Sequence, residues 1–382
     1  MITSKRGLKI IVKLPFSGCE FKPVPLHQDS VRNQELIIEG LRKAYGKVVA
    51  VDSLSFEVKK GEVFGLLGPS GCGKSTTLKI IAGLEEPDQG DIFLKGRRIN
   101  DIPVHKRQTA MVFQNYALFP HMTIYNNVAF GLKMLKVDVG EIKKRVEEIL
   151  GLVQLPGVGD RYPGQLSGGQ QQRIALARVL VLRPDVLLLD EPLSNLDAKL
   201  RETMRIELKD IQRSVGITTI FVTHDIQEAF ALSDRVAVMN QGRIEQMGPP
   251  QDIYDSPTTE FVATFVGQPN FFDGRITAFS FGSVRFLSEH GISFLLAEGK
   301  ALKLGQKARL VVRPEKISIN TERQGKDNSF EGKVTRSIYL GEITKYLVDV
   351  KGMRFLANST RFVPEGSRVW AEWDKEDNFI IP

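Results

Sequence analysis

The pattern of hydrophobic and polar residues divides the chain into three stretches. Residues 1–35 show no sustained periodicity and are broken by prolines, so we expect a poorly ordered leader there. From residue 36 to residue 266, short apolar runs alternate with amphipathic helical stretches, which predicts an α/β domain with a mainly parallel sheet. At residues 267–382, alternating segments separated by turn residues predict a second, all-β domain that forms a small barrel.

Within the α/β stretch, strand-type apolar runs disappear between residues 116 and 182. A helical pattern is clear at residues 141–153, where Ile142, Val146 and Leu150 fall on one face. The sequence therefore predicts a mostly helical insert at residues 116–182.

Composition narrows the class of protein. The 42% hydrophobic and 25% charged fractions are those of a soluble globular protein. No apolar run approaches the roughly 18 residues that span a bilayer, and the run at residues 9–13 is broken by charge, so we expect neither a transmembrane helix nor a signal peptide. The two cysteines, Cys19 and Cys72, favour a reducing cytosol over a disulfide framework. Acidic and basic residues are interspersed, so the net charge of +7 predicts a mixed, solvated surface and no nucleic-acid partner.

A glycine-rich loop follows a buried-strand run at residues 63–67 and precedes a helical pattern. It fits the phosphate-loop motif G-x-x-x-x-G-K-[ST] in the strand–loop–helix context that the motif requires. Its residues, predicted together to form a nucleotide-binding loop, are Gly68, Pro69, Ser70, Gly71, Cys72, Gly73, Lys74, Ser75 and Thr76. Glycines let backbone N–H groups converge on a phosphate, and the helix N-terminus adds about half a positive charge. We expect Lys74 to reach the β- and γ-phosphates and Ser75 to coordinate Mg²⁺; the alternative is a turn that only joins a strand to a helix.

Three further apolar runs are each followed directly by reactive side chains, which are Gln114, Asp190 with Glu191, and His224. Because ligands bind at the carboxyl ends of strands in open α/β sheets, we expect these residues beside the phosphate loop. Asp190 and Gln114 are candidate Mg²⁺ ligands. Glu191 can orient and deprotonate an attacking water, and His224 can hold the γ-phosphate and this carboxylate in line. A single glutamine or histidine is more often structural, but together these residues predict a site of nucleotide hydrolysis.

A second candidate anion site begins another helix. The run Leu166-Ser167-Gly168-Gly169-Gln170 precedes a helical pattern, and Ser167 is a candidate N-cap. The phosphate loop does not need a second such site in the same chain. This arrangement suggests that residues 166–170 serve a γ-phosphate bound to another chain.

With these motifs in this order, the chain resembles the ATP-binding subunits of ABC transporters over residues 36–266. The resemblance adds a D-loop at residues 194–197 and implies ATP and Mg²⁺ as ligands, with Glu191 and His224 catalytic. It also implies that two copies face head-to-tail and that Tyr45 stacks on adenine. The residues that would then act in trans on the partner's ATP are Ser167, Gly168, Gly169, Gln170 and Asp197.

The second domain resembles the C-terminal domain of importer ATPases that serve maltose, polyamines, ferric iron or oxyanions. Residues 312–315 and 339–342 carry this resemblance, and residues 265–270 favour the polyamine and iron group. The resemblance implies a motor at the cytoplasmic face of the inner membrane, working with two membrane-spanning permease subunits and, indirectly, an extracytoplasmic solute-binding protein. Spermidine or putrescine is the expected solute.

Three alternatives stay open at this point. The solute could be ferric iron, an oxyanion or a sugar. A non-transport ATPase of the same superfamily is disfavoured. Such proteins insert a long coiled coil before the motif that corresponds to residues 166–170, or they fuse two ATPase cassettes. Here only about 90 residues separate Lys74 from Ser167. The β-domain could also bind a regulator or the solute, together with the transport role.

Overall fold

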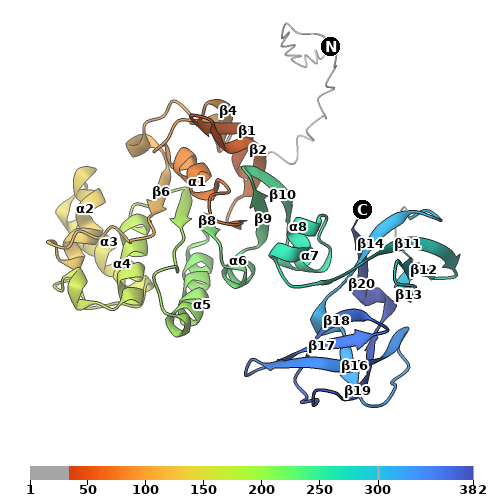
Figure 1. The fold of residues 1–382 in the computed structure, drawn as a ribbon. Coiled ribbons are helices and arrows are strands. Elements are labelled where there is room, and N and C mark those ends of the chain that lie inside the picture. The colour runs from red at the N-terminus through yellow and green to blue at the C-terminus, as the bar shows by residue number, and fades with distance from the viewer. Residues whose placement is uncertain (1–33, 299–301, 382) are drawn as a thin grey trace, which may run out of the picture.

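The computed structural model describes residues 34–298 and 302–381. The expected leader lies outside the described residues except for residues 34 and 35, which begin the first strand. Figure 1 shows an α/β domain followed by a β-rich domain.

A six-stranded sheet in the order β10-β9-β3-β8-β7-β6 forms the centre of the first domain. All neighbouring strands are parallel except β10 and β9, which confirms the predicted mainly parallel sheet. Strands β3 and β8 are buried along their whole length, as expected where both faces of a sheet are covered. The strands are β3 (Val63–Leu67), β6 (Thr109–Val112), β7 (Val186–Asp190), β8 (Thr218–Thr223), β9 (Arg235–Asn240) and β10 (Arg243–Gly248).

A second, antiparallel sheet in the order β2-β1-β4-β5 covers helix α1. Its strands are β1 (Gln34–Tyr45), β2 (Val48–Lys59), β4 (Gln89–Leu94) and β5 (Arg97–Arg98). The buried side chains of α1, such as Leu78 and Ile81, share one hydrophobic cluster with both sheets. This layer was not foreseen from the sequence.

Helices α2, α3 and α4 form a lobe at one side of the domain (Figure 1), as the predicted insert at residues 116–182 requires. In α3, Ile142, Val146 and Leu150 are buried, which confirms the predicted face. The helices of the domain are α1 (Lys74–Ala82), α2 (Ile124–Met134), α3 (Val139–Leu152), α4 (Gly168–Leu180), α5 (Ala198–Val215), α6 (Ile226–Leu232), α7 (Pro250–Asp255) and α8 (Glu260–Phe265).

The C-terminal domain consists of two five-stranded antiparallel sheets, β13-β12-β11-β14-β20 and β15-β19-β16-β17-β18, that share one core. Phe294 and Trp373 lie at its centre, with ring centroids 5.9 Å apart. The strands are β11 (Asn270–Ser280), β12 (Ser283–Ser288), β13 (Ser293–Ala297), β14 (Lys307–Val312), β15 (Ser318–Asn320), β16 (Asn328–Tyr339), β17 (Thr344–Val350), β18 (Met353–Ser359), β19 (Arg368–Trp373) and β20 (Asn378–Ile381). The predicted all-β, barrel-like domain is confirmed.

One buried arginine joins the two domains. Arg313, after β14, donates hydrogen bonds to the carbonyl oxygens of Ala263 (2.9 Å) and Tyr254 (2.8 Å). Its guanidinium lies 4.2 Å from the centre of the Tyr254 ring, a cation–π contact. Because this charge is desolvated, its hydrogen bonds hold β14 firmly against α7 and α8.

Across residues 34–298 and 302–381, no helix is both long and apolar enough to cross a membrane.

Candidate functional site

The loop between β3 and α1 is shaped by its glycines and by Lys74. Gly73 has a φ of +103°, and a Cβ there would lie 2.1 Å from the carbonyl oxygen of Ala50, so only glycine fits. The buried Lys74 side chain donates from Nζ to the carbonyl oxygens of Gly68 (2.7 Å) and Pro69 (2.9 Å). A fixed ammonium therefore lies inside the loop, beside the N-terminus of α1.

Ser75 and Asp190 form the candidate metal site. The Ser75 hydroxyl donates to Asp190 Oδ1 at 2.9 Å, which joins the start of α1 to the end of β7. Burial raises the pKa of Asp190, and the nearby Glu191 adds to this shift. A hydroxyl and a carboxylate are hard oxygen donors of the kind Mg²⁺ prefers. In the described part of the chain no three His, Cys, Asp or Glu side chains gather as a metal site, so phosphate and water oxygens would supply the remaining ligands.

Glu191 lies between the other two predicted strand-end residues. His224 Nδ1 is 3.1 Å from Glu191 Oε1, and Gln114 Nε2 donates to Glu191 Oε2 at 3.2 Å and to Ser194 Oγ at 3.1 Å. The Glu191 backbone has a φ of +46°, which is strained for a residue with a Cβ. A hydrogen bond from its N–H to the Val222 carbonyl (3.1 Å) supports this conformation.

Gln114 therefore lies differently from the expectation that it binds metal. Its amide nitrogen is directed to Glu191 and Ser194, and only its amide oxygen is of the kind that binds Mg²⁺. The role of Gln114 as a metal ligand stays a prediction.

Residues 166–170 lie elsewhere in the chain. Ser167 Oγ accepts from the Gln170 N–H (3.4 Å), and Gln170 Oε1 accepts from the Ser167 N–H (3.0 Å), so the two residues form a reciprocal cap on α4. Helix α4 belongs to the helical lobe, whereas the phosphate loop begins α1 beneath the antiparallel sheet (Figure 1). The two predicted anion sites thus lie in different parts of one chain.

The first residues of α4 contact the start of α5. A Cβ on Gly168 would lie 3.2 Å from Leu196, and one on Gly169 would lie 3.2 Å from Met204 Sδ. Asp197 caps α5 by accepting from the Leu200 N–H at 2.9 Å. A Cβ at either position would therefore be in tight contact with these side chains.

Tyr45 and Cys72 complete the predicted set. The Tyr45 ring, at the end of β1, is 47% exposed; its hydroxyl donates to Glu85, and Lys43 Nζ lies 5.6 Å from the ring centre. An exposed ring is available for stacking. Cys72 is buried with its Sγ 3.7 Å from Lys74 Nζ, and burial raises the pKa of the thiol, so it is a poor nucleophile.

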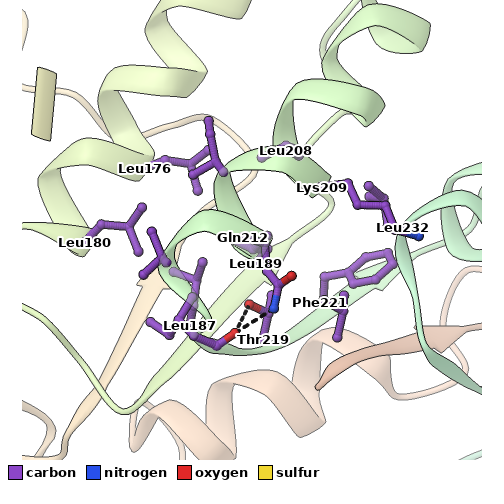
Figure 2. Close-up of a pocket in the computed structure, with 14 residues that line it drawn as sticks. Leu176, Leu180, Leu187, Leu189, Leu208, Lys209, Gln212, Thr219, Phe221 and Leu232 are labelled. Atoms are coloured by element: carbon purple, nitrogen blue, oxygen red, sulfur yellow. Dashed lines mark hydrogen bonds between the residues drawn. The ribbon is translucent and has the colours of Figure 1, made fainter. Parts of the chain in front are cut away.

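An apolar cavity of about 30 Å³ lies between the central sheet, α4 and α5 (Figure 2). Leucines such as Leu176 and Leu208, together with Phe221, surround it. It is too small for a nucleotide and lacks charged groups that converge on a ligand. The reactive edge at the strand ends is the better candidate for the functional site.

Known proteins resemble both domains of the chain. A family model described as ABC transporter matches residues 51–194, and one described as TOBE domain matches residues 310–381. The spermidine/putrescine import ATP-binding protein PotA of Oleidesulfovibrio alaskensis is 48% identical over 82% of this chain and 85% of that protein. PotA of Thermobifida fusca is 47% identical over 90% of this chain and 93% of that protein. The chain belongs to the ABC transporter ATP-binding proteins.

Solved structures of ABC transporter ATP-binding proteins share the fold of its first domain. The protein cbiO1 of Clostridium perfringens, part of an ABC transporter complex, has a TM-score of 0.55 and 33% identity over 58% of this chain and 90% of that chain. A dimeric ATP-binding cassette, MJ0796, bound to ADP and Pi, has a TM-score of 0.50 and 32% identity over 56% of this chain and 98% of that chain. The resemblance found in the sequence is therefore confirmed.

Sequence reasoning missed several residues of this ABC ATP-binding domain that support the site. Arg178 donates to the carbonyls of Tyr116 (2.9 Å) and Ala117 (2.6 Å), just after Gln114. Asp225 caps helix α6, which follows His224, and Glu228 lies in the first turn of that helix. An aspartate followed three residues later by a glutamate, before an apolar run, is a helix-capping signal. This signal could have identified Asp225 and Glu228 from the sequence.

Two glycines of the loop, Gly71 and Gly73, give a matched test of its geometry. Gly71→Ala has φ +82° and open space around the added Cβ, so we expect it to destabilise the fold by about 1 kcal/mol. Gly73→Ala adds a clash with the Ala50 carbonyl to similar strain, so we expect about 3 kcal/mol and loss of nucleotide binding. Thermal unfolding and binding of a fluorescent nucleotide measure both effects. Equal losses in the two variants would contradict the close approach at Gly73.

Proposed function

We propose that this chain is the ATP-hydrolysing motor subunit of a bacterial polyamine importer that carries spermidine or putrescine. The observation that carries this proposal is the position of Glu191 between His224 and Gln114, one residue after Asp190, which is bonded to Ser75 of the phosphate loop. The relatives named as spermidine/putrescine import proteins support the choice of solute.

In this proposal the loop residues hold the phosphates of ATP. The ammonium of Lys74 neutralises the β- and γ-phosphates, and backbone N–H groups at the start of α1 add to the positive potential. Ser75 and Asp190 would hold Mg²⁺, which neutralises developing negative charge when bound. Positioning and electrostatics account for most of the catalysis of phosphoryl transfer, so these few groups suffice.

In this proposal the attacking water transfers its proton to the Glu191 carboxylate. The Gln114 amide and the His224 ring contact opposite oxygens of this carboxylate and fix its orientation. His224 is exposed enough to reach the γ-phosphate as well, with 54% of its side chain accessible. Tyr45 would stack on adenine, a contact of about 1–3 kcal/mol if it resembles base–aromatic stacking elsewhere.

The working form in this proposal is a head-to-tail dimer. Its main support is that the capped start of α4, with its glycines, lies in the helical lobe apart from the phosphate loop. In a second copy that faces the first, residues 166–170 and Asp197 would complete the partner's phosphate site. The dimeric cassette among the similar structures supports this arrangement.

The remaining partners are two membrane-spanning permease subunits and, indirectly, an extracytoplasmic solute-binding protein. The motor would lie at the cytoplasmic face of the inner membrane. The segment after Gln114 is suited to transmit ATP-driven changes, because it leads from the catalytic carboxylate into the helical lobe. Its Tyr116 is buried and Phe119 packs on Phe130 (ring centroids 4.9 Å apart), so its aromatic residues serve mainly to anchor the segment.

Uptake into proteoliposomes tests the function. Vesicles are prepared with this chain, the permease subunits, the solute-binding protein and ATP. They should accumulate labelled spermidine, but they should not accumulate sulfate, maltose or ferric iron. Accumulation of one of those solutes instead would refute the choice of polyamine. Absence of ATP hydrolysis by the intact complex would refute the motor role itself.

Replacement of Glu191 tests the proposed base. Glu191→Gln removes the proton acceptor but keeps the side-chain size, so turnover should fall about 10²- to 10⁴-fold while ATP binding persists. The trapped ATP should also stabilise the dimer, measured by light scattering. Steady-state hydrolysis near that of the wild type would remove Glu191 from this role.

Two further variants test the composite site. Lys74→Ala should abolish tight ATP·Mg²⁺ binding, whereas Ser167→Arg should spare binding to the monomer and block hydrolysis by the dimer. Mixtures of the two variants should recover at most one working site per dimer. If Ser167→Arg weakens nucleotide binding to the monomer as much as Lys74→Ala does, residues 166–170 do not act in trans.

A further inference from the structure

The turn that carries His224 is fixed by hydrogen bonds on both sides. Before it, the Thr223 hydroxyl donates to Glu228 Oε2 at 2.7 Å. After it, the Asp225 N–H donates to the same Thr223 oxygen at 3.0 Å. One buried hydroxyl therefore holds the backbone of the turn against the first turn of α6.

The Asp225 carboxylate extends this connection to α5. Its Oδ1 accepts from the Glu228 N–H at 3.1 Å and caps α6. Its Oδ2 accepts from Arg205 Nη2 at 3.0 Å and lies 3.7 Å from Arg201 Nη1. The aspartate thus belongs both to the His224 turn and to the surface of α5.

Arg201 completes the connection at the D-loop. Its Nη2 donates to the Leu196 carbonyl at 3.0 Å and its Nε to the Leu193 carbonyl at 3.3 Å. These two carbonyls flank residues 194 and 195 of the D-loop, just before the Asp197 cap. A continuous chain of contacts runs from Glu228 through Thr223, Asp225 and Arg201 to the D-loop.

Glu228 is an unusual member of this chain. Its side chain is 3% exposed, and Oε1 has no partner among the residues that the structure describes. Burial raises the pKa of the Glu228 carboxyl to about 7, opposed by the Thr223 hydrogen bond. The charged groups that act on it are Asp225 at its own helix cap and Arg205 and Arg201 on α5, and the packed strands β3 and β8 contain none. Helix α7, which neighbours α6, carries Asp252 and Asp255.

We propose that Glu228, Thr223, Asp225 and Arg201 act as positioning residues that tie the His224 turn to the D-loop. The inference rests on the proposed ATPase function. It adds a link within one chain between His224 and the D-loop, which would face the second copy in the proposed dimer. None of the four needs to contact nucleotide. A displacement of the D-loop by a second copy would shift Arg201 and Asp225 and so the ring of His224 against Glu191.

A double-mutant cycle tests the link on the full-length chain. Thr223→Val removes the hydroxyl at constant size, and Arg201→Gln releases the D-loop carbonyls. Because a small misplacement of a catalytic group is costly, each should lower kcat about tenfold with little change in KM for ATP. If the residues act as one chain, the double variant should lose no more than the worse single variant.

Controls separate positioning from general damage. Thr223→Ser keeps the hydroxyl and should restore kcat to near the wild-type value. Arg213→Gln, at an exposed site of α5, the helix that also carries Arg201, should leave kcat unchanged. The link would be overturned if the fold-losses in kcat of the two single variants multiply in the double variant, or if Thr223→Val keeps the wild-type kcat. Absence of ATP hydrolysis by the intact wild-type complex would instead refute the proposed function.

Glu228→Gln gives a readout that packing alone would not change. Glutamine still accepts from Thr223, but only the ionised carboxylate forms a charge-assisted hydrogen bond. The ratio of wild-type to Glu228→Gln kcat should therefore be near one below about pH 6 and rise at least about twofold as pH passes through about 7. The exposed Glu202→Gln should give a flat ratio. A flat ratio for Glu228→Gln as well would exclude the carboxyl from the link.

The same titration predicts how stability changes with pH. The carboxyl binds its proton more tightly in the folded chain than in the unfolded one, whose ordinary value is 4.5, so the wild type loses stability relative to Glu228→Gln as pH rises from 4.5 through about 7. Unfolding midpoints between pH 5 and 8 should diverge in that direction. Parallel midpoints would show that Glu228 does not titrate in this range and would overturn its part in the proposal.

Discussion

The parallel pairing of β3, β8, β7 and β6 is the constraint on which the site depends. Leu67 pairs with Thr223, Asp190 with Val222, and Val112 with Leu189, so the four strands end within about a residue of one another. Each reactive residue is at a strand end or just beyond one. Because side chains alternate across a strand, a slip of one residue in any pair would turn one of these groups away from the others.

The backbone at this edge is strained at three residues. Glu191, Tyr116 and Ala117 have φ values of +46°, +61° and +46°, in the left-handed region that disfavours a Cβ. Each is held by contacts from elsewhere: the Glu191 N–H by the Val222 carbonyl, and the other two by Arg178 of α4. The buried sheet and helix α4 thus stabilise the conformation of the site, in which Gln114 contacts Glu191.

The strand ends could be predicted from the sequence because each follows a short, mostly apolar run, which is typical of a buried parallel strand. The antiparallel sheet could not. Strand β1 has several register shifts against β2. Charged residues such as Lys43 interrupt the alternation of apolar and polar residues along it, so the strand pattern is hard to recognise. Contacts between distant segments were equally hidden: Gln114 and Glu191 are 77 positions apart, and no local pattern shows which amide atom faces the carboxylate.

The packing of Gly168 against Leu196 has a consequence for how two copies would communicate. It places the start of α4 and the D-loop of one chain in contact, so the residues expected to face a partner form one surface. Arg201 ties that same surface to the turn of His224, which faces the chain's own phosphate loop. Since packed interfaces shift between discrete arrangements rather than deforming continuously, a partner that moves this surface would also move the histidine. In the proposed dimer, contact with the partner and alignment of the proposed catalytic carboxylate of Glu191 would be one conformational step.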